Sequence, residues 1–136
     1  MAFEHRRRVR FQDTDPAGIV FFANIFVYCH EAFEEMLRDA GLPLEAIIAS
    51  REQVLRLVHA DADFERPLRV GVLVTIRTSV ASVGERSFRM QYEMFDEAGA
   101  HLASAATVHV AVDPASGKSA VLSRRIRAAL EKHQAR

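Results

Sequence analysis

The stretch from Phe11 to Asn24, F-Q-D-T-D-P-A-G-I-V-F-F-A-N, carries residue types suited to acyl-transfer chemistry. Pro16 fixes its own φ and restricts Asp15 to an extended conformation, while Gly18 tolerates backbone angles or close approaches that a side chain would forbid. If a helix begins just beyond, its unpaired N–H groups lie near the Asp15 carboxylate and can polarise a carbonyl or bind an oxyanion. The same string is also typical of an ordinary turn in which aspartate caps a backbone N–H.

A second carboxylate, Asp13, lies two residues before Asp15. Alternation along an extended segment would turn both side chains the same way, so Asp13 could share acid and base duties. The favoured role is a turn or capping hydrogen bond, because aspartates in such strings commonly accept from nearby backbone N–H groups.

A strand before this stretch and a helix after it must position these residues. Apolar residues alternate with charged ones from Phe3 to Phe11, which predicts a strand with one solvated face. Asn24 can act as an N-cap, and apolar residues then recur at spacings of three and four. They are Phe26, Cys29, Phe33, Met36, Leu37 and Ala40. This spacing predicts a core helix of about 4 turns that ends at Gly41, with Pro43 just beyond.

The remainder of the chain is mainly extended. After a short helical turn expected from Leu44 to Ser50, four segments rich in Val, Thr, Phe and Tyr are separated by short turns that contain Gly or Pro. The four segments are Val54–Phe64, Val70–Val83, Ser87–Phe95 and Leu102–Val112. Successive strands with short turns pair antiparallel. A serine cap and an apolar stripe from Ser123 to Gln134 predict a closing surface helix. The fold class is α+β, in a single domain over residues 1–136.

Composition limits the class of protein. The 136 residues contain 18 Lys plus Arg and 18 Asp plus Glu, so the chain fits one domain with a sizeable core and no net charge. Without a basic excess no nucleic-acid partner is expected, and the run Arg6-Arg7-Arg8 is interpreted as a solvated strand face. Cys29 is the single cysteine, which excludes an internal disulfide and suits a reducing cytoplasm. With no signal core and no run long enough to span a bilayer, we expect a soluble cytoplasmic protein with no membrane role.

The string D-T-D-P-A-G-I-V-F-F-A-N resembles the signature of the 4-hydroxybenzoyl-CoA thioesterase family of hotdog-fold enzymes. The likeness continues through C-H-E-A-F-E at 29–34, L-V-H-A-D-A-D-F at 57–64 and G-E-R-S-F at 84–88, nearly the whole chain. The later segments look most like the branch that hydrolyses 1,4-dihydroxy-2-naphthoyl-CoA. The resemblance implies a hotdog fold, a curled antiparallel sheet wrapped around one long central helix. It also implies a homo-oligomer, dimer or tetramer, with active sites at the dimer interface.

The resemblance assigns roles within the first motif. Asp15 matches the family's catalytic aspartate, either as a nucleophile that forms a mixed anhydride or as a general base for water. The backbone N–H of Phe22 would polarise the thioester carbonyl, while Gly18 would allow close approach of the substrate. Relatives that act on short-chain acyl-CoA have Y-H-A-S where this chain has F-F-A-N. Phe22 in place of that histidine favours an aromatic, bulky acyl group.

Two histidines are candidates for contact with the acyl group. His30 lies on the shoulder of the apolar helix face, and His59 lies in the segment that resembles the naphthoyl-CoA branch. Either can hydrogen-bond a ring hydroxyl or orient water, although a buried histidine is more often a packing residue.

The resemblance implies an acyl-CoA substrate, whose phosphates require cationic or hydroxyl partners. Arg86 and Ser87 stand where aryl-CoA enzymes carry a basic cluster for the nucleotide, although Glu85 interrupts the run. The alternative phosphate partners lie in the tail, where a solvated helix face is the favoured interpretation. They are Arg124, Arg125 and Arg127.

No cofactor is implied, and no metal site is expected, because the string H-E-A-F-E has Glu34 where a zinc-protease helix has histidine. Two alternatives to an aromatic acyl-CoA thioesterase stay open. One is a thioesterase for aliphatic acyl-CoA or for chains on acyl carrier protein, and the other is a non-catalytic acyl-binding scaffold. The intact Asp15–Gly18 motif argues against the scaffold, and its likeness to hydrolases argues against a dehydratase on this fold.

Overall fold

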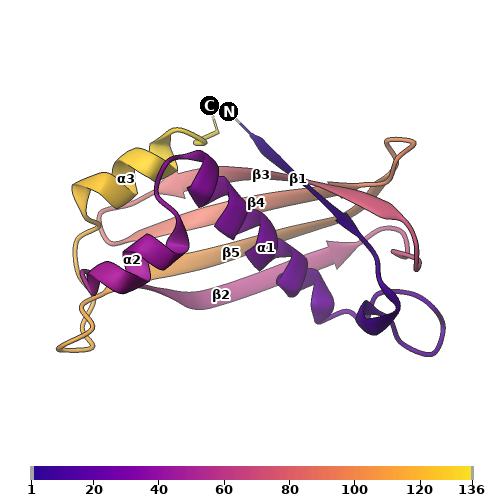
Figure 1. The fold of residues 1–136 in the computed structure, drawn as a ribbon, viewed down its shortest axis with the longest axis horizontal. Coiled ribbons are helices and arrows are strands. Elements are labelled where there is room, and N and C mark those ends of the chain that lie inside the picture. The colour runs from indigo at the N-terminus through magenta and orange to yellow at the C-terminus, as the bar shows by residue number, and fades with distance from the viewer. Residues whose placement is uncertain (1, 136) are drawn as a thin grey trace.

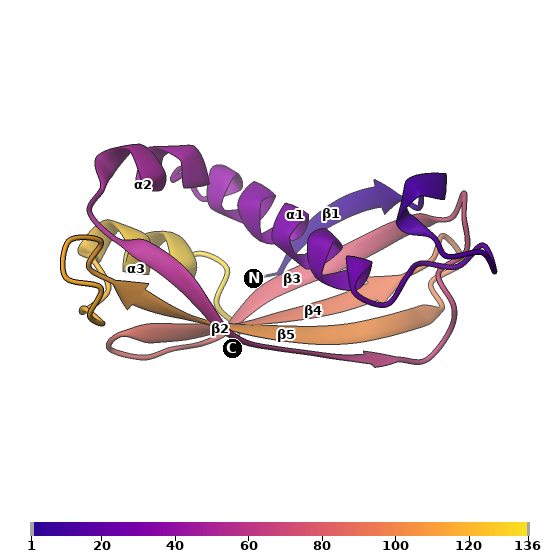
Figure 2. The ribbon, with the colours of Figure 1, turned by 90° about the horizontal axis from the view of Figure 1, so that it is seen from below.

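The computed structural model describes residues 2–135, which form one five-stranded antiparallel sheet with all helices on one face (Figure 1; Figure 2). The strands are β1 (Phe3–Arg8), β2 (Val54–Phe64), β3 (Leu73–Val83), β4 (Ser87–Phe95) and β5 (His101–Val112). Their order across the sheet is β1-β3-β4-β5-β2. The chain between β1 and β2 therefore crosses from one edge of the sheet to the other.

Three helices cover the sheet. They are α1 (Asn24–Asp39), α2 (Leu44–Ser50) and α3 (Arg124–Glu131), and a 3-10 turn, η1 (Phe11–Asp13), precedes α1. The long helix α1 lies across the concave face, as Figure 2 shows. Ser123 caps α3 by accepting a hydrogen bond from the N–H of Ile126 at 3.3 Å. The predicted arrangement of a curled antiparallel sheet around one long helix is confirmed.

The core fills the space between α1 and the sheet. The helix buries one stripe, consisting of Ile25, Tyr28, Cys29, Ala32, Phe33, Met36 and Leu37. Opposite it lie the inward residues of the three central strands. Those of β3 and β4 alternate with outward residues that are mostly polar. The inward residues are Val74, Ile76, Thr78 and Val80 of β3, Phe88, Met90, Tyr92 and Met94 of β4, and Ala103, Ala105, Thr107, His109 and Ala111 of β5.

Several element boundaries differ from those expected, including the start of β5 at His101 instead of Leu102 and the end of α3 at Glu131 instead of Gln134. The strand β1 ends at Arg8 instead of Phe11, because the chain turns into η1. The strand β3 begins at Leu73 instead of Val70, because Val70 and Gly71 donate hydrogen bonds to the β1–α1 segment and so pin it to the sheet. Asn24 is the first residue of α1 and not its N-cap. Among residues 2–135, no helix is long and apolar enough to cross a bilayer.

Candidate active site

The loop from Thr14 to Val20 is a narrow hairpin with Asp15 near its base. Thr14 and Val20 form an antiparallel bridge, and the Asp15 N–H donates to the Ile19 carbonyl at 2.9 Å. Gly18 has φ +78° and donates its N–H to the Asp15 carbonyl at 3.0 Å. Because this φ lies in the left-handed region, glycine closes the turn without strain.

The Asp15 side chain is partly exposed, and only one of its two carboxylate oxygens accepts a hydrogen bond in the described structure. Its Oδ1 accepts the N–H of Ala17 at 2.8 Å, while Oδ2 has no hydrogen bond within residues 2–135. The capping turn expected as an alternative is therefore present, and it orients the side chain. One oxygen stays free to attack a carbonyl or to take a proton from water.

The entry to α1 leaves backbone donors open beside this loop. The Phe21 N–H donates to the Asp13 carbonyl at 2.9 Å, and the Asn24 N–H donates to the Phe21 carbonyl at 2.8 Å. Between them, the N–H groups of Phe22 and Ala23 have no hydrogen bond within the described chain. Unpaired N–H groups at a helix N-terminus carry partial positive charge, so they can stabilise an oxyanion.

Asp13 is buried and serves the structure of the loop. Its carboxylate accepts the Tyr28 hydroxyl at 2.7 Å, the Arg10 N–H at 2.9 Å and Nη1 of Arg7 at 3.0 Å. Burial alone would raise the pKa of Asp13, but these hydrogen bonds and the charge of Arg7 outweigh burial and hold the pKa below its ordinary value. A carboxylate bound so completely is a poor general base, and the favoured capping role agrees with this geometry.

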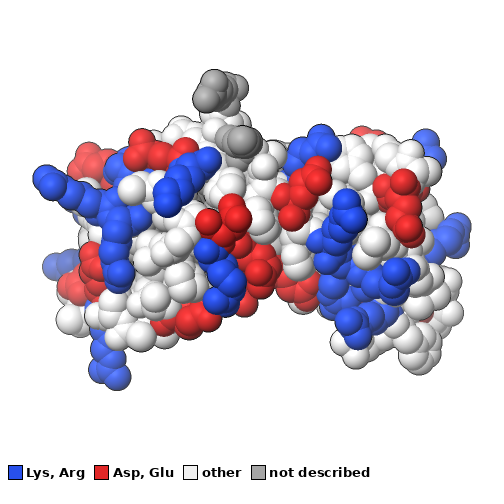
Figure 3. All heavy atoms as spheres, turned by 45° about the horizontal axis from the view of Figure 1, so that its top comes forward, with Lys and Arg blue, Asp and Glu red and all other residues white. Residues whose placement is uncertain are grey.

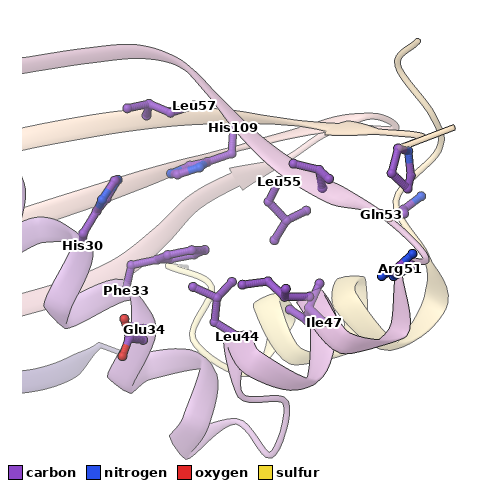
Figure 4. Close-up of a pocket in the computed structure, with 13 residues that line it drawn as sticks. His30, Phe33, Glu34, Leu44, Ile47, Arg51, Gln53, Leu55, Leu57 and His109 are labelled. Atoms are coloured by element: carbon purple, nitrogen blue, oxygen red, sulfur yellow. The ribbon is translucent and has the colours of Figure 1, made fainter. Parts of the chain in front are cut away.

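A cavity of about 490 Å³ lies between α1, α2, β2 and β5 (Figure 4). Its wall is mainly apolar, with Phe33 from α1, Leu44 and Ile47 from α2, and Leu55 and Leu57 from β2. This volume lies in the range of small-molecule sites. His30 is the cavity-lining residue of α1 nearest to the start of the helix. It lies six residues after Asn24, about 9 Å along the helix axis.

His109 is a buried polar residue among the aromatic rings of this cavity. Only 2% of it is exposed, and its ring stacks on Phe33 and Phe88 with centroid distances of 5.0 and 4.9 Å. Its Nε2 lies 3.0 Å from the Thr107 hydroxyl, which in turn lies 3.1 Å from the hydroxyl of Tyr92. A hydrogen-bonded chain therefore runs from the core to the wall of the cavity.

The other ring nitrogen of His109, Nδ1, is buried without a hydrogen-bond partner in the described structure. Burial and the nearby His30 lower the pKa of His109 to about 4, although the Leu55 backbone offsets part of this effect. His109 is therefore neutral at pH 7.

Of the two histidines predicted to contact the acyl group, the cavity includes His30 and excludes His59. His59 pairs with Val108 after a register shift in β2, and its side chain contacts Asp61 at 2.9 Å on the outer face of the sheet. The bulge at Val58 reverses the alternation of β2, so His59 and the cavity lie on opposite faces in this chain.

Arg86 and Ser87 lie far from the Asp15 loop of the same chain. They follow the β3–β4 turn, whereas Gly18 accepts a hydrogen bond from Val70, just before β3 begins. The 11 residues of β3 separate the two ends, about 35 Å of extended chain. Arg86 donates to the Ser119 carbonyl at 2.9 Å, so its guanidinium already has a partner.

Sequence reasoning missed His109 and the α2 wall of the cavity. Alternation along β5 offered a signal for His109, because it shares a face with Ala105 and Thr107 in a strand that must contact α1. No local pattern shows that Leu44 and Ile47 would approach β2.

The comparisons with known proteins agree over most of the chain. Residues 9–130 match the family model described as the Thioesterase-like superfamily. The 1,4-dihydroxy-2-naphthoyl-CoA hydrolase of Trichodesmium erythraeum is 38% identical over 129 residues, which cover 93% of this chain and 94% of that protein.

Two solved structures give the same result in three dimensions. The 1,4-dihydroxy-2-naphthoyl-CoA thioesterase from Synechocystis superposes with a TM-score of 0.89 at 33% identity, covering 96% of both chains. A gentisyl-coenzyme A thioesterase superposes with a TM-score of 0.84 at 28% identity, covering 94% of this chain and 99% of that one. The resemblance and hotdog fold predicted from the sequence are confirmed, and the chain belongs to the thioesterase-like superfamily.

Proposed function

We propose that this protein hydrolyses the thioester of an aromatic acyl-CoA to the free acid and CoA, with Asp15 as the catalytic carboxylate. One observation carries the proposal: a carboxylate with a free oxygen lies in the same short segment as two unpaired N–H groups at a helix start. These are the parts that acyl transfer requires, an attacking or proton-accepting group and an oxyanion site. Named relatives that act on aromatic acyl-CoA support the choice of substrate.

The reaction can follow either of two routes. In the first, an Asp15 oxygen attacks the thioester carbon, the negative charge on the carbonyl oxygen is held by the N–H of Phe22, and CoA leaves as its thiolate. Water then hydrolyses the mixed anhydride and restores the carboxylate. In the second, Asp15 takes a proton from water as that water attacks the same carbon. Both routes use the same two groups.

The acyl group is proposed to bind in the apolar cavity. An aromatic ring fits beside Phe33, with Leu44 and Leu55 opposite, and buried apolar contact provides the affinity. His30 is exposed at the edge of this space and can contact a ring hydroxyl.

We also propose a homo-oligomer, dimer or tetramer, formed through β2. This edge strand is 11 residues long and exposes apolar side chains, including Val54 (49%), Leu57 (41%) and Phe64 (49%). A long apolar edge strand pairs readily with a second copy. Val54, Leu55 and Leu57 of this edge strand line the cavity, so a partner subunit paired with β2 would lie beside it. Sedimentation velocity tests this proposal, and a monomer at micromolar concentration overturns it.

The reducing cytoplasm is the proposed location, supported by the single buried Cys29. Burial raises the pKa of this thiol to about 12, so it is unreactive at neutral pH.

Free-thiol release tests the activity. The panel contains 1,4-dihydroxy-2-naphthoyl-CoA, 4-hydroxybenzoyl-CoA, benzoyl-CoA and aliphatic CoA esters from short to long. Turnover of an aromatic ester that falls at least 100-fold in Asp15→Asn supports the proposal. Preference for an aliphatic ester or an acyl-carrier-protein thioester corrects the substrate class. Binding of acyl-CoA without turnover of any ester would establish a non-catalytic scaffold instead.

A further inference from the structure

The connection between β2 and β3, residues 65–72, pairs with the hairpin that carries Asp15. Arg69 of the connection forms an antiparallel bridge with Ile19 of the hairpin. Two backbone hydrogen bonds flank this bridge. They join the Val20 N–H to the Leu68 carbonyl at 2.8 Å and the Val70 N–H to the Gly18 carbonyl at 3.0 Å. A shift of the β2–β3 connection therefore moves the Asp15 carboxylate.

His101, the first residue of β5, ties the beginning of this connection to the sheet. Its Nδ1 lies 2.9 Å from Oε2 of Glu65, and its Nε2 lies 2.7 Å from Oε1 of Glu93 on β4. A neutral imidazole has one N–H and one lone pair, so it can donate to only one of these carboxylates. The geometry therefore fits the imidazolium, which donates to both. We call Glu65, His101 and Glu93 the His101 clamp.

The charges around His101 favour its protonated form. They are Glu65 after β2, Asp63 on β2 opposite Ser104, Glu93 on β4, and Arg77 of β3, which lies over the Phe95 ring that contacts His101 edge-on. Three of these four groups are carboxylates. The hydrogen bonds to Glu65 and Glu93 raise the pKa of His101 above its ordinary value, and burial offsets part of this effect.

The two carboxylates of the clamp depend on His101 to different degrees. Ser104 and Gln91 each donate to the Glu93 carboxylate at 2.7 Å, so Glu93 keeps its position when His101 is neutral. The Glu65 side chain is 61% exposed and has no other side-chain partner within residues 2–135. Loss of the imidazolium charge therefore releases Glu65, which is the end of the clamp that belongs to the β2–β3 connection.

Most ion-paired carboxylates in the described chain have an arginine partner. Acidic and basic side chains lie beside one another over much of the surface shown in Figure 3. Arginine keeps its charge at any pH at which the protein is folded, whereas histidine changes its charge between pH 5 and 8. The contact at Glu65 is therefore sensitive to pH where most of the other ion pairs are not.

We propose that His101 is a positioning residue for thioester hydrolysis: its imidazolium holds Glu65 and the β2–β3 connection, and loss of the proton loosens the hairpin that carries Asp15. This inference rests on the proposed function. The clamp is complete below about pH 6.5, the ordinary histidine value, and is lost as the pH rises through the raised pKa of His101. The value of kcat should therefore fall on the alkaline side.

The kinetic test follows kcat for an aromatic acyl-CoA from about pH 6 to about pH 9. Wild-type kcat should fall about threefold over this range with little change in KM, because the position of Asp15 affects the reaction more than binding. His101→Gln should have the lower kcat at every pH. Glu65→Gln keeps an acceptor for Nδ1 but no charge, so its kcat should fall at a lower pH than in wild type.

Asp39→Asn is the matched control. It removes a carboxylate that lies 3.0 Å from His133, another histidine–carboxylate pair, and this pair does not contact the β2–β3 connection. The pH profile of this variant should match that of wild type.

Amide hydrogen exchange provides a readout that does not depend on turnover. At about pH 6, the protection factors of the Val20 and Val70 amides should be several-fold lower in His101→Gln than in wild type. An NMR titration of His101 should give a pKa that coincides with the fall in wild-type kcat.

An alkaline fall in kcat that persists unchanged in His101→Gln overturns the positioning role. So does equal protection of the two amides in this variant and in wild type, or a wild-type kcat that stays constant while His101 titrates. If wild type turns over no aromatic ester, the proposed function fails, and the exchange measurement still tests the clamp.

Discussion

The hydroxyl of Tyr28, in the second turn of α1, donates a hydrogen bond to Oδ2 of Asp13 at 2.7 Å. The Asp13 carbonyl in turn accepts the Phe21 N–H and the Asn24 side-chain amide, each at 2.9 Å. Asp13 therefore joins the first strand of the Asp15 hairpin to its second strand and to the helix. The position of the free carboxylate relative to the helix N-terminus depends on this junction.

Tyr28→Phe tests the junction by removing one hydroxyl from a fully buried ring. We expect the free energy of unfolding to fall by about 1–2 kcal/mol and kcat to fall several-fold, because Asp13 loses one of its donors and the loop loosens. KM should change little. Urea unfolding and thiol release measure the two effects. Glu45→Gln, which removes the exposed Arg38–Glu45 ion pair at 2.8 Å, is the control, and an equal loss of kcat in it would contradict this role.

Oxygen isotope labelling distinguishes the two routes proposed for Asp15. A single turnover in H₂¹⁸O by the nucleophilic route places ¹⁸O in the Asp15 side chain when water attacks the anhydride at that carbon, or yields an acid that carries an Asp15 oxygen when the enzyme was labelled beforehand. By the general-base route all ¹⁸O enters the acid and Asp15 stays unlabelled, which is also the pattern when water attacks the acyl carbon of the anhydride. Peptide mass spectrometry of the segment containing Asp15 measures the label: ¹⁸O in Asp15 establishes the nucleophilic route, and a second readout, trapping of the Asp15 anhydride with hydroxylamine, is expected only by that route. Heavy-isotope transfer to any other carboxylate would exclude both assignments.

His109 should make the protein sensitive to mild acid. Its pKa of about 4 lies below the unfolded value near 6.5, so the unfolded chain binds the proton first, and the stability that neutral His109 provides is lost as pH falls from 6.5 to 4. The loss from this one group is on the order of 3 kcal/mol.

His109→Phe keeps an aromatic ring beside Phe33 and Phe88 but cannot titrate. Urea unfolding at pH 7 and pH 4 should show a smaller acid-induced loss in this variant than in wild type. Equal losses would mean that another group controls the acid transition.

Gly18→Ala should reduce activity more than stability. A Cβ built there meets nothing within 4 Å, so the cost arises from φ +78° alone, roughly 1 kcal/mol. If the loop relaxes to a negative φ, the Asp15 carboxylate moves relative to the Phe22 N–H, and kcat should fall about tenfold or more. Gly99→Ala, at φ +87° in the β4–β5 turn and equally open, is the matched control and should keep full kcat. Equal activity in both variants would contradict the proposed role of Gly18.

Much of the fold is predictable because its local signals agree. The bounds of β2, β4 and α2 match the expected ones, since alternation or helical spacing there ends at glycine, proline or acidic turns. The end of β1 was missed for a physical reason. Its pattern continues to Phe11, but the Asp13 carboxylate accepts the Arg10 N–H and draws the chain into η1.

The candidate site is predictable only where its residues are neighbours in sequence. Asp15, Gly18 and the Phe22 N–H occupy one motif, and the structure places them in one loop. The residues of the cavity wall come from four separate elements, so no spacing of residues along the sequence predicts the cavity. His59 shows the limit most clearly: one extra residue in β2 turns its side chain to the other face of the sheet, and a bulge has no reliable signal in a single sequence.

The strand order also sets when this protein can fold during synthesis. Each edge strand pairs with a strand that is synthesised later, since β1 pairs with β3 and β2 pairs with β5. Until residue 112 has left the ribosome, β2 has no strand beside it and the apolar stripe of α1 has an incomplete sheet to cover. Folding is therefore a late and collective event, and a nascent chain stalled before β5 exposes an apolar strand and an apolar helix face that chaperones would bind.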